Sequence, residues 1–308
     1  GQKVGYWPYG YNSFHFDITK YLKPGEKNTL AVRLENLPES SRWYPGAGLY
    51  RNVHLIITED AYIPVWGTYI TTPSVNEKFA KVNVRTKVVL PEGADPAKYS
   101  VETSVWNPNK QKLTAVRTSL AQMKYNNNQA EQEFVIQAPS LWSPEMPALY
   151  SAETRLYEGD KLKDIYTTPF GIRSIEIIPD KGFFLNGKRT VFKGVCNHHD
   201  LGPLGAAVND AAIRRQIRIL KDMGCNAIRT SHNMPAPELI RACDEMGMMI
   251  MAESFDEWNV AKCKNGYNLL FDEWAEKDLV NLLHNFRNNP SVVMWCIGNE
   301  VPNQWNEG

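Results

Sequence analysis

The second half of the chain alternates apolar strand-like runs with amphipathic helical runs, and no other feature constrains the fold as much. Four strands are predicted, at residues 190–196, 226–232, 248–254 and 291–300. Three helices are predicted between them, at residues 210–223, 236–247 and 271–288. Near-continuous apolar strands separated by amphipathic helices are typical of a parallel sheet covered by helices. A (β/α)8 barrel and an open, doubly wound sheet both fit this pattern.

Residues that end helices support these boundaries. Gly224 and Gly247 follow the first two predicted helices, where glycine commonly forms the left-handed cap, and Pro290 follows the third. No GxGxxG or GxxxxGK(S/T) motif follows any predicted strand. The absence of both motifs disfavours an open sheet that binds nucleotides.

The residues before this region are rich in strands and turns instead. Residues 61–172 contain seven strand candidates separated by turn residues, which is typical of an immunoglobulin-like β-sandwich. Residues 1–60 contain shorter runs of the same kind, for example the alternation of Phe14 and Phe16 with polar neighbours. We expect strands there and interpret the segment as part of an antiparallel β-domain. A hairpin at Asn186–Gly187 begins the α/β region.

Charge and composition exclude some classes of partner. Lys+Arg and Asp+Glu both number 34, so neither nucleic acid nor a membrane surface is expected as a partner. The basic residues of the first predicted helix are expected to form a solvated face: Arg214, Arg215, Arg218 and Lys221. No apolar run has the length of a membrane span. The five cysteines lack CxxC spacing, which argues against a zinc site or a thioredoxin-like site. Several of them lie in apolar runs that suit buried thiols, so a disulfide framework is not expected.

Polar residues follow each strand of the α/β region where that strand ends. They are Asn197 to Asp200, Ser231 to Asn233, Glu253, and Asn299 with Glu300. In a (β/α)8 barrel the active site is built at this face. A surface that served only solubility would favour Lys, Arg and Glu. We therefore predict a site at the carboxyl ends of the four strands.

Most of these residues also have a structural explanation, which the sequence leaves open. His198 and His199 fit a loop pair, His232 fits a strand-end histidine, and Asp200 fits a loop cap. Glu253 fits a partner for a neighbouring backbone or for Arg229.

Glu300 is the strongest candidate for chemistry. It follows the apolar run 292–297, and partial desolvation raises the pKa of a carboxyl group and suits a proton donor. The histidines lie on separate strands without an HExxH motif, so no catalytic metal and no required cofactor are predicted. An accessory magnesium or sodium ion near Glu257 or Glu300 stays open.

Several of these stretches resemble motifs of glycoside hydrolase family 2, the family of β-galactosidases and β-glucuronidases. Residues 226–251, "NAIRTSHNMPAPELIRACDEMGMMIM", are similar to its first long signature. Residues 287–300, "RNNPSVVMWCIGNE", are similar to its second. "GYNSFHFDIT", "RWYPGAGLYRNV" and "FFLNGKRTVFKGV" resemble connecting motifs, and the resemblance covers essentially the whole chain.

The resemblance implies three domains. Residues 1–60 would be part of a sugar-binding jelly-roll domain, residues 61–172 an immunoglobulin-like β-sandwich, and residues 173–308 the N-terminal half of a TIM-barrel catalytic domain. It further implies a retaining hydrolase of β-glycosidic bonds, with an oligo- or polysaccharide as the partner.

The resemblance also implies roles for the candidate residues. Glu300 would be the general acid/base, and Asn299 would hold the sugar 2-hydroxyl. The other substrate-binding candidates are His232, His198, His199, Asp200 and Glu253, with Arg42 and Trp43 approaching from the first segment.

The sequence departs from the family pattern in several ways. In the family, the nucleophile is a second glutamate at the end of the seventh barrel strand, whereas this sequence stops after the fourth. We therefore expect a fragment that is inactive alone. Asn233 stands where tyrosine is frequent, and Asn259 stands where some galactosidases carry a metal-binding histidine.

The function therefore stays open between related activities. A β-D-galactoside is the favoured substrate because "SRWYPGAGLYRNV" and "FDEW" look most like the bacterial galactosidase branch. A β-glucuronidase or a β-mannosidase is the alternative within the family, and a non-catalytic carbohydrate-binding protein is the alternative of another class. Homo-oligomerisation and a periplasmic or cytoplasmic location in a bacterium are left open.

Overall fold

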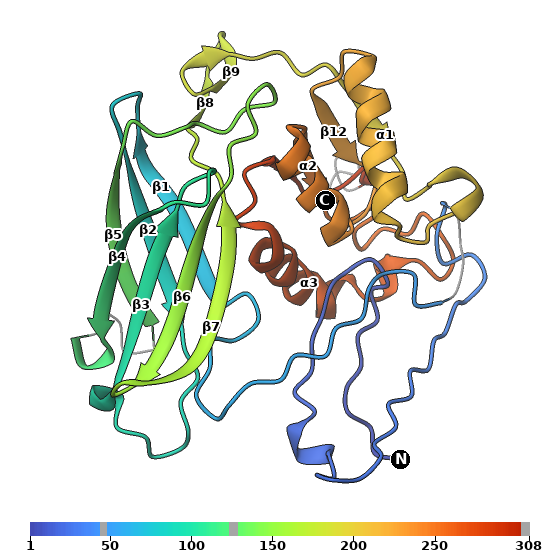
Figure 1. Ribbon diagram of the computed structural model, residues 1–308. Helices are drawn as coiled ribbons and strands as arrows, with labels where there is room; N and C mark the ends of the chain where they lie inside the picture. Colours follow the sequence, from blue (N-terminus) through green and yellow to red (C-terminus); the bar gives the residue numbers. More distant parts are fainter. Residues whose placement is uncertain (44–47, 123–128, 303–308) are drawn as a thin grey trace.

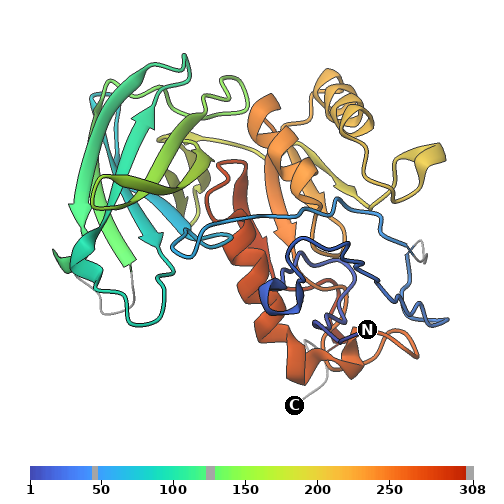
Figure 2. The ribbon, with the colours of Figure 1, turned by 60° about the horizontal axis from the view of Figure 1, so that its bottom comes forward.

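The computed structural model describes residues 1–43, 48–122 and 129–302. Figure 1 shows a β-sandwich on one side and a parallel sheet with helices on the other. Residues 1–60 run beside the helical side, as the turned view of Figure 2 also shows.

The sandwich consists of seven antiparallel strands, and all seven sequence-predicted strands are confirmed. They are β1 (Thr68–Val75), β2 (Phe79–Lys87), β3 (Tyr99–Trp106), β4 (Lys112–Ser119), β5 (Gln129–Gln137), β6 (Tyr150–Glu158) and β7 (Lys161–Phe170). One sheet has the order β1-β2-β5 and the other has the order β4-β3-β6-β7.

Alternation along the strands builds the sandwich core. In β2, Ala80, Val82 and Val84 are fully buried, whereas Lys81 and Arg85 on the opposite face are exposed. Buried residues of both sheets form one cluster, so each sheet covers the apolar face of the other.

A small three-stranded sheet, β8 (Ile175–Ile178), β9 (Gly182–Leu185) and β10 (Lys188–Arg189), follows the sandwich. The predicted turn at Asn186–Gly187 is confirmed, with φ values of 54° and 74° at the two central residues. Phe183 and Leu185 pack against Ala227 and Met249, the first residues of two parallel strands. The small sheet therefore covers the amino ends of those strands.

The α/β region contains four parallel strands in the order β11-β12-β13-β14. The strands are β11 (Gly194–Asn197), β12 (Ala227–Thr230), β13 (Met249–Glu253) and β14 (Val292–Cys296). The helices are α1 (Asp210–Asp222), α2 (Pro237–Met246) and α3 (Phe271–Phe286), and short 3-10 turns occur at Thr19–Tyr21, Pro96–Lys98, Leu120–Gln122, Gly202–Leu204 and Tyr267–Leu269. The sequence-predicted alternation is confirmed.

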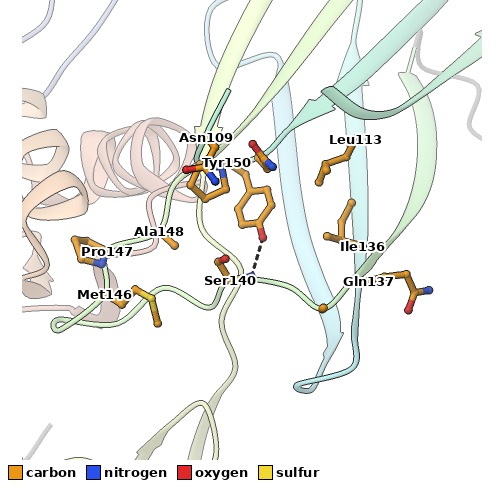
Figure 3. Close-up of a pocket in the computed structure, with 12 residues that line it drawn as sticks. Asn109, Leu113, Ile136, Gln137, Ser140, Met146, Pro147, Ala148 and Tyr150 are labelled. Carbon is orange, nitrogen blue, oxygen red and sulfur yellow. Dashed lines mark hydrogen bonds between the residues drawn. The ribbon is translucent and has the colours of Figure 1, made fainter. Parts of the chain in front are cut away.

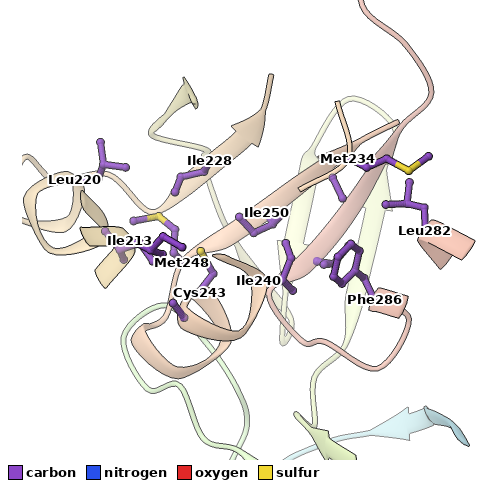
Figure 4. Packing of buried hydrophobic residues seen from close by; sticks show 14 of the residues in the cluster. Ile213, Leu220, Ile228, Met234, Ile240, Cys243, Met248, Ile250, Leu282 and Phe286 are labelled. Atoms are coloured by element: carbon purple, nitrogen blue, oxygen red, sulfur yellow. The ribbon is translucent and has the colours of Figure 1, made fainter. Parts of the chain in front are cut away.

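The helices cover one face of this sheet. Figure 4 shows Ile228 and Ile250 of the strands facing apolar residues of the helices, including Ile240 and Phe286. Gly247 ends α2 with a φ of 73°, the left-handed conformation that favours glycine.

The strands predicted within residues 1–60 do not form among the residues described there. A strand requires hydrogen bonds to a neighbouring strand, and this segment pairs with none. Its alternating apolar residues are accordingly exposed, for example Leu30 at 64% and Leu55 at 72%.

Side-chain contacts attach this first segment to the α/β region instead. Tyr9 is buried in the α/β core, and its hydroxyl donates to the Ser254 carbonyl at 2.7 Å. Trp7 and Asn12 donate to the Asp278 carboxylate on α3 at 2.8 and 2.6 Å.

Lys221, the cysteines and the length of the helices were also subjects of the sequence predictions. Lys221 is not on a solvated face, because its ammonium donates to the carbonyls of Pro144, Met246 and Gly247 and satisfies the carboxyl end of α2. All five cysteines are free thiols. In the part of the chain that the structure describes, no helix has the length and apolarity needed to span a membrane.

Candidate active site

Most of the polar residues predicted from the strand ends gather at the carboxyl edge of the parallel sheet. The register aligns Asn197 of β11 with Thr230 of β12, and Glu253 of β13 with Cys296 of β14. The Arg229 side chain donates to Glu253 and to Asn299, and His232 contacts Glu253. Alignment of parallel strands therefore brings together residues up to 70 positions apart in the sequence.

Glu253 lies at the centre of this group and is fully buried. Arg229 donates to Oε1 at 2.9 Å and places its Nε 2.6 Å from Oε2. His232 Nδ1 lies 3.0 Å from Oε1. Burial raises the pKa of the Glu253 carboxyl group to about 7, although the charge and hydrogen bond of Arg229 act in the opposite direction.

His232 is a neutral imidazole at neutral pH. Burial, together with the charge of Arg229, lowers its pKa to about 4. When the Glu253 carboxylate accepts the Nδ1–H, Nε2 is left as the hydrogen-bond acceptor of the ring. The ring belongs to an aromatic group with Trp43 and His198, at centroid distances of 5.4 and 5.2 Å.

The His199 and Asp200 side chains make contacts outside the group around Glu253. His199 packs on Tyr11 at a centroid distance of 5.1 Å, and burial lowers its pKa to about 3, with the charge of Arg51 acting in the same direction. The Asp200 carboxylate accepts the Gly202 N–H at 2.8 Å, so it caps the following loop. Their predicted contact with substrate stays a prediction.

Asn299 follows β14 and is almost fully buried. Its Oδ1 accepts from Arg229 at 3.1 Å, and its Nδ2 donates to the Asp256 carboxylate at 2.9 Å. Its backbone N–H donates to the Phe255 carbonyl at 3.1 Å, and its carbonyl accepts from Lys262. The loop after β13 thus holds the loop after β14.

Arg42 and Trp43 do reach this region from the first segment. Arg42 makes two hydrogen bonds to Asp256, from Nε at 2.7 Å and from Nη2 at 2.6 Å. Trp43 lies between Arg42, whose Cζ is 4.6 Å from the ring centroid, and His198, whose ring centroid is 4.5 Å away.

Sequence reasoning missed three features of the site. It did not identify Asp256 or Lys262, and it did not identify Arg229 as a hydrogen-bond partner of Asn299. Burial raises the pKa of Asp256, but hydrogen bonds from Arg42 and Asn299 and the charge of Lys262 outweigh it, so the pKa is lowered. The available signal was a position, since Asp256 follows the end of β13 by three residues.

Glu300 differs from the expectation in its environment. Its side chain is exposed, so the partial desolvation inferred from the preceding apolar run is wrong. The reason is that β14 is an edge strand, along which Trp295 and Ile297 are themselves 41% and 62% exposed. Glu300 has a φ of 42°. The pKa of Arg42 is raised mainly by the hydrogen bonds that Arg42 donates to Asp256, and the charge of Glu300 contributes in the same direction.

Glu257, a candidate for an accessory cation, is used by its own loop. Its carboxylate accepts the backbone N–H groups of Lys262 and Asn268. A Cβ at Gly266 would lie 1.8 Å from Glu257 Oε1, so a larger residue there would displace this carboxylate. Within the described ranges, no group of three or more His, Cys, Asp or Glu side chains is placed to hold a metal ion.

An open hollow of about 440 Å³ lies away from this site, on the sandwich (Figure 3). Tyr150 lies in it, and its hydroxyl accepts the Ser140 N–H at 2.9 Å. Its wall includes Met146 and Pro147. Among its described lining residues there is no Asp, Glu, His, Lys, Arg or Cys, in contrast to the carboxyl edge of the sheet.

A β-sandwich followed by a parallel α/β sheet with histidine, carboxylate and amide groups at its carboxyl edge is the arrangement of a barrel-type catalytic domain with an accessory β-domain. Residues 176–307 match the family description "Glycosyl hydrolases family 2, TIM barrel domain", and residues 62–173 match "Glycosyl hydrolases family 2". The chain belongs to glycosyl hydrolase family 2.

Similar proteins agree with this assignment. The chain is 45% identical over all its 308 residues to "Beta-galactosidase BoGH2A" of Bacteroides ovatus, and 38% identical over 303 residues to a "Putative beta-glucuronidase" of Formosa agariphila. It spans 36% and 28% of the length of these two relatives. A solved family 2 member from Bacteroides cellulosilyticus superimposes with a TM-score of 0.91 at 38% identity, over 98% of this chain and 39% of that one.

Proposed function

We propose that the complete protein is a retaining β-glycosidase that acts on terminal non-reducing β-D-galactosides, with Glu300 as its acid/base. The observation that carries this proposal is the Asn299–Glu300 pair after β14, with Asn299 held among Arg229 and Asp256 at the carboxyl edge of a family 2 barrel sheet. The exposure of Glu300 suits a group that exchanges protons with substrate and water.

In this mechanism Glu300 protonates the glycosidic oxygen while a second carboxylate attacks the anomeric carbon. Water then releases the sugar, with Glu300 as the base. Retention requires the two carboxyl groups to be about 5–5.5 Å apart. Glu253 is a poor nucleophile because it is fully buried and bonded to Arg229 and His232. In this proposal the nucleophile is a carboxylate outside residues 1–308, as the resemblance to the family implies.

The charges around the site favour a neutral sugar over a uronate. Binding a uronate carboxylate requires a cation that is not already paired. In the described part of the site, Arg42 and Lys262 contact Asp256, and Arg229 contacts Glu253. The name of the Bacteroides ovatus relative points to the same substrate.

A β-glucuronidase is the second candidate, because relatives from Formosa agariphila and Bacteroides fragilis carry that name. A β-mannosidase and a non-catalytic carbohydrate-binding protein are weaker candidates, since no observation on the site favours them.

A panel of nitrophenyl β-D-glycosides, tested on the full-length protein and on residues 1–308 side by side, decides between these candidates. We expect turnover of the galactoside by the full-length protein only. Turnover of the glucuronide alone would select the second candidate, and binding without turnover would select the non-catalytic one. Turnover by residues 1–308 would place the nucleophile within them.

The role of Glu300 has its own test in the full-length protein. Glu300→Gln is expected to lower turnover of a disaccharide by about 10²–10⁴-fold, the usual contribution of general acid catalysis. The first step on an activated aryl glycoside should fall much less, because such a leaving group needs little protonation. The control is Glu276→Gln, since Glu276 is also an exposed carboxylate and lies on α3. This variant should leave turnover of both substrates unchanged. Equal loss on the two substrates would remove Glu300 from the role.

A further inference from the structure

The Asn299 side-chain amide is held in one orientation. An amide has two N–H donors and two acceptor lone pairs. One lone pair receives Arg229, and one N–H goes to Asp256. A rotation of the amide by 180° would turn its NH2 group to the guanidinium and its oxygen to the carboxylate. Both contacts would then be repulsive, so the neighbours select a single orientation.

Asp256 is in turn held from three directions. Arg42 approaches it from the first segment with two hydrogen bonds, across 214 positions of sequence. Lys262 places its ammonium 2.7 Å from the Asp256 carbonyl and 3.4 Å from the carboxylate. The same ammonium donates to the Asn299 carbonyl. The Asp256 side chain is only 13% exposed, so these contacts are largely shielded from water.

Asp256 has little capacity left to bind a ligand itself. Oδ2 accepts from Arg42 Nε, and Oδ1 accepts from Arg42 Nη2 and Asn299 Nδ2. A carboxylate has about four acceptor positions, and at least three of them are occupied. Any effect of Asp256 on a reaction therefore passes through the groups that it holds.

We propose that Asp256, braced by Arg42, is a positioning residue that fixes the Asn299 amide so that its second Nδ2–H donates to a hydroxyl group of the substrate. This inference rests on the proposed function and names the route by which residues 1–60 take part in it. Arg42 acts through Asp256 and not by contact with the sugar. The Arg42–Asp256–Asn299 chain couples the first segment to the loop that carries Glu300.

The test compares losses on matched substrates in the full-length protein. Asp256→Ala is assayed on nitrophenyl β-D-galactoside, on its 2-deoxy analogue and on its 6-deoxy analogue, the β-D-fucoside. We expect kcat/KM to fall by about 10–100-fold on the galactoside and the fucoside, as is usual for supporting residues of a site. The loss on the 2-deoxy substrate should be only a few-fold, because that substrate lacks the hydroxyl through which Asp256 acts.

Other variants separate positioning from simple damage to the loop. Asp256→Asn keeps an acceptor for Asn299 and should recover part of the activity on the galactoside. Arg42→Ala should show the same selectivity as Asp256→Ala with a smaller loss. Glu257→Gln disturbs the same loop without touching Asn299, and its losses should be equal on all three substrates.

Equal losses of Asp256→Ala on the three substrates would overturn the inference, and so would a loss confined to the fucoside. If the wild-type protein fails on galactosides, the proposed function fails first. A crystal structure of the Asp256→Ala full-length protein then decides the inference separately. The Asn299 side chain should leave its wild-type rotamer, and an unchanged Asn299 would overturn the positioning role.

Discussion

The β-sandwich and the first segment carry the same kind of sequence pattern but are held in different ways. In the sandwich, backbone pairing joins β2 to both β1 and β5, and the alternating apolar residues meet in a closed core. In residues 1–60, the apolar residues alternate in the same way, but no strand pairs among residues 1–43 and 48–60, which the structure describes. Leu30, Val32 and Leu34 are all at least 49% exposed.

The difference separates two meanings of alternation. A period of two gives a strand one apolar face, but burial of that face requires a second sheet and a neighbouring strand. The first segment instead attaches through single side chains at Tyr9, Asn12, Arg42 and Arg51. The Arg42 attachment ends at Asp256 in the candidate site, and the Tyr9 attachment ends at Ser254, next to Glu253. This segment therefore contributes to the site more directly than the sandwich does.

The largest expected effect is on the attachment of the first segment. Asp278→Ala removes the carboxylate that accepts from Trp7, Asn12 and Tyr267. Asn12 still donates to the backbone carbonyl of residue 278, so the half-buried Trp7 and the buried Tyr267 are the two donors that lose their acceptor. A hydrogen bond to a charged group contributes about 1.5–3 kcal/mol, so the loss of these two costs about 3–6 kcal/mol. We expect a loss of this size in urea unfolding, together with faster proteolysis of residues 1–60.

The control for this prediction is Glu276→Ala, an exposed residue of the same helix, which should change stability by less than about 0.5 kcal/mol. If Asp278→Ala leaves the proteolysis of residues 1–60 unchanged, side-chain contacts do not attach the segment.

The second effect concerns the sandwich core. Ile136→Ala on β5 removes a side chain that is 4% exposed and packs between the two sheets, at a cost of about 2–4 kcal/mol. Val135→Ala, one residue earlier on the outer face, is the matched control, since Val135 is 49% exposed. Urea unfolding should separate the two variants clearly. Equal costs would mean that the two faces of β5 do not differ in burial.

Much of the fold could be predicted because its patterns are local. The seven sandwich strands, the Asn186–Gly187 turn and the alternation of strands and helices follow from periodicity and turn residues. The gathering of polar strand ends followed from one rule of parallel sheets. The exposure of Glu300 could not be predicted, because it depends on whether a further strand pairs with β14.

The contacts that organise the site were also beyond sequence reasoning. Asp256 and Lys262 lie in a loop without periodicity, and their partners, Arg42 and Asn299, are distant along the chain. Glu253 was an open choice between a site role and a bond to Arg229, and the structure shows that bond. Position on a strand end predicted where these groups lie, but not which of them hold the others.

A third prediction uses pH to test the contact between Tyr11 of the first segment and His199 of the α/β region. The folded-state pKa of His199 is lowered to about 3, below the ordinary value of 6.5. Between these values the unfolded chain binds more protons than the folded one, so stability is present above pH 6.5 and is lost as the pH falls towards 3. The slope contributed by His199 is at most about 1.4 kcal/mol per pH unit.

The measurement compares urea unfolding of the wild type and His199→Gln between pH 7 and pH 4. We expect the variant to lose less stability on acidification. Glu253 and Asp244, with pKa values raised to about 7 and about 6, act in the opposite direction, but they are present in both proteins and cancel in the difference. Parallel curves for the two proteins would contradict the burial of neutral His199.

The smallest expected effect completes the comparison between the first segment and the sandwich. Ile57 is 85% exposed although its run, "VHLII", reads like a strand. In residues 1–308, Ile57→Ala should change the free energy of unfolding by less than about 0.5 kcal/mol, far below the cost of Ile136→Ala, because there is no burial to lose. In the full-length protein the same change should cost more if additional strands pair with this run. A cost in residues 1–308 as large as that of Ile136→Ala would mean that the run has found a partner there, and the first segment would then be held in the same way as the sandwich.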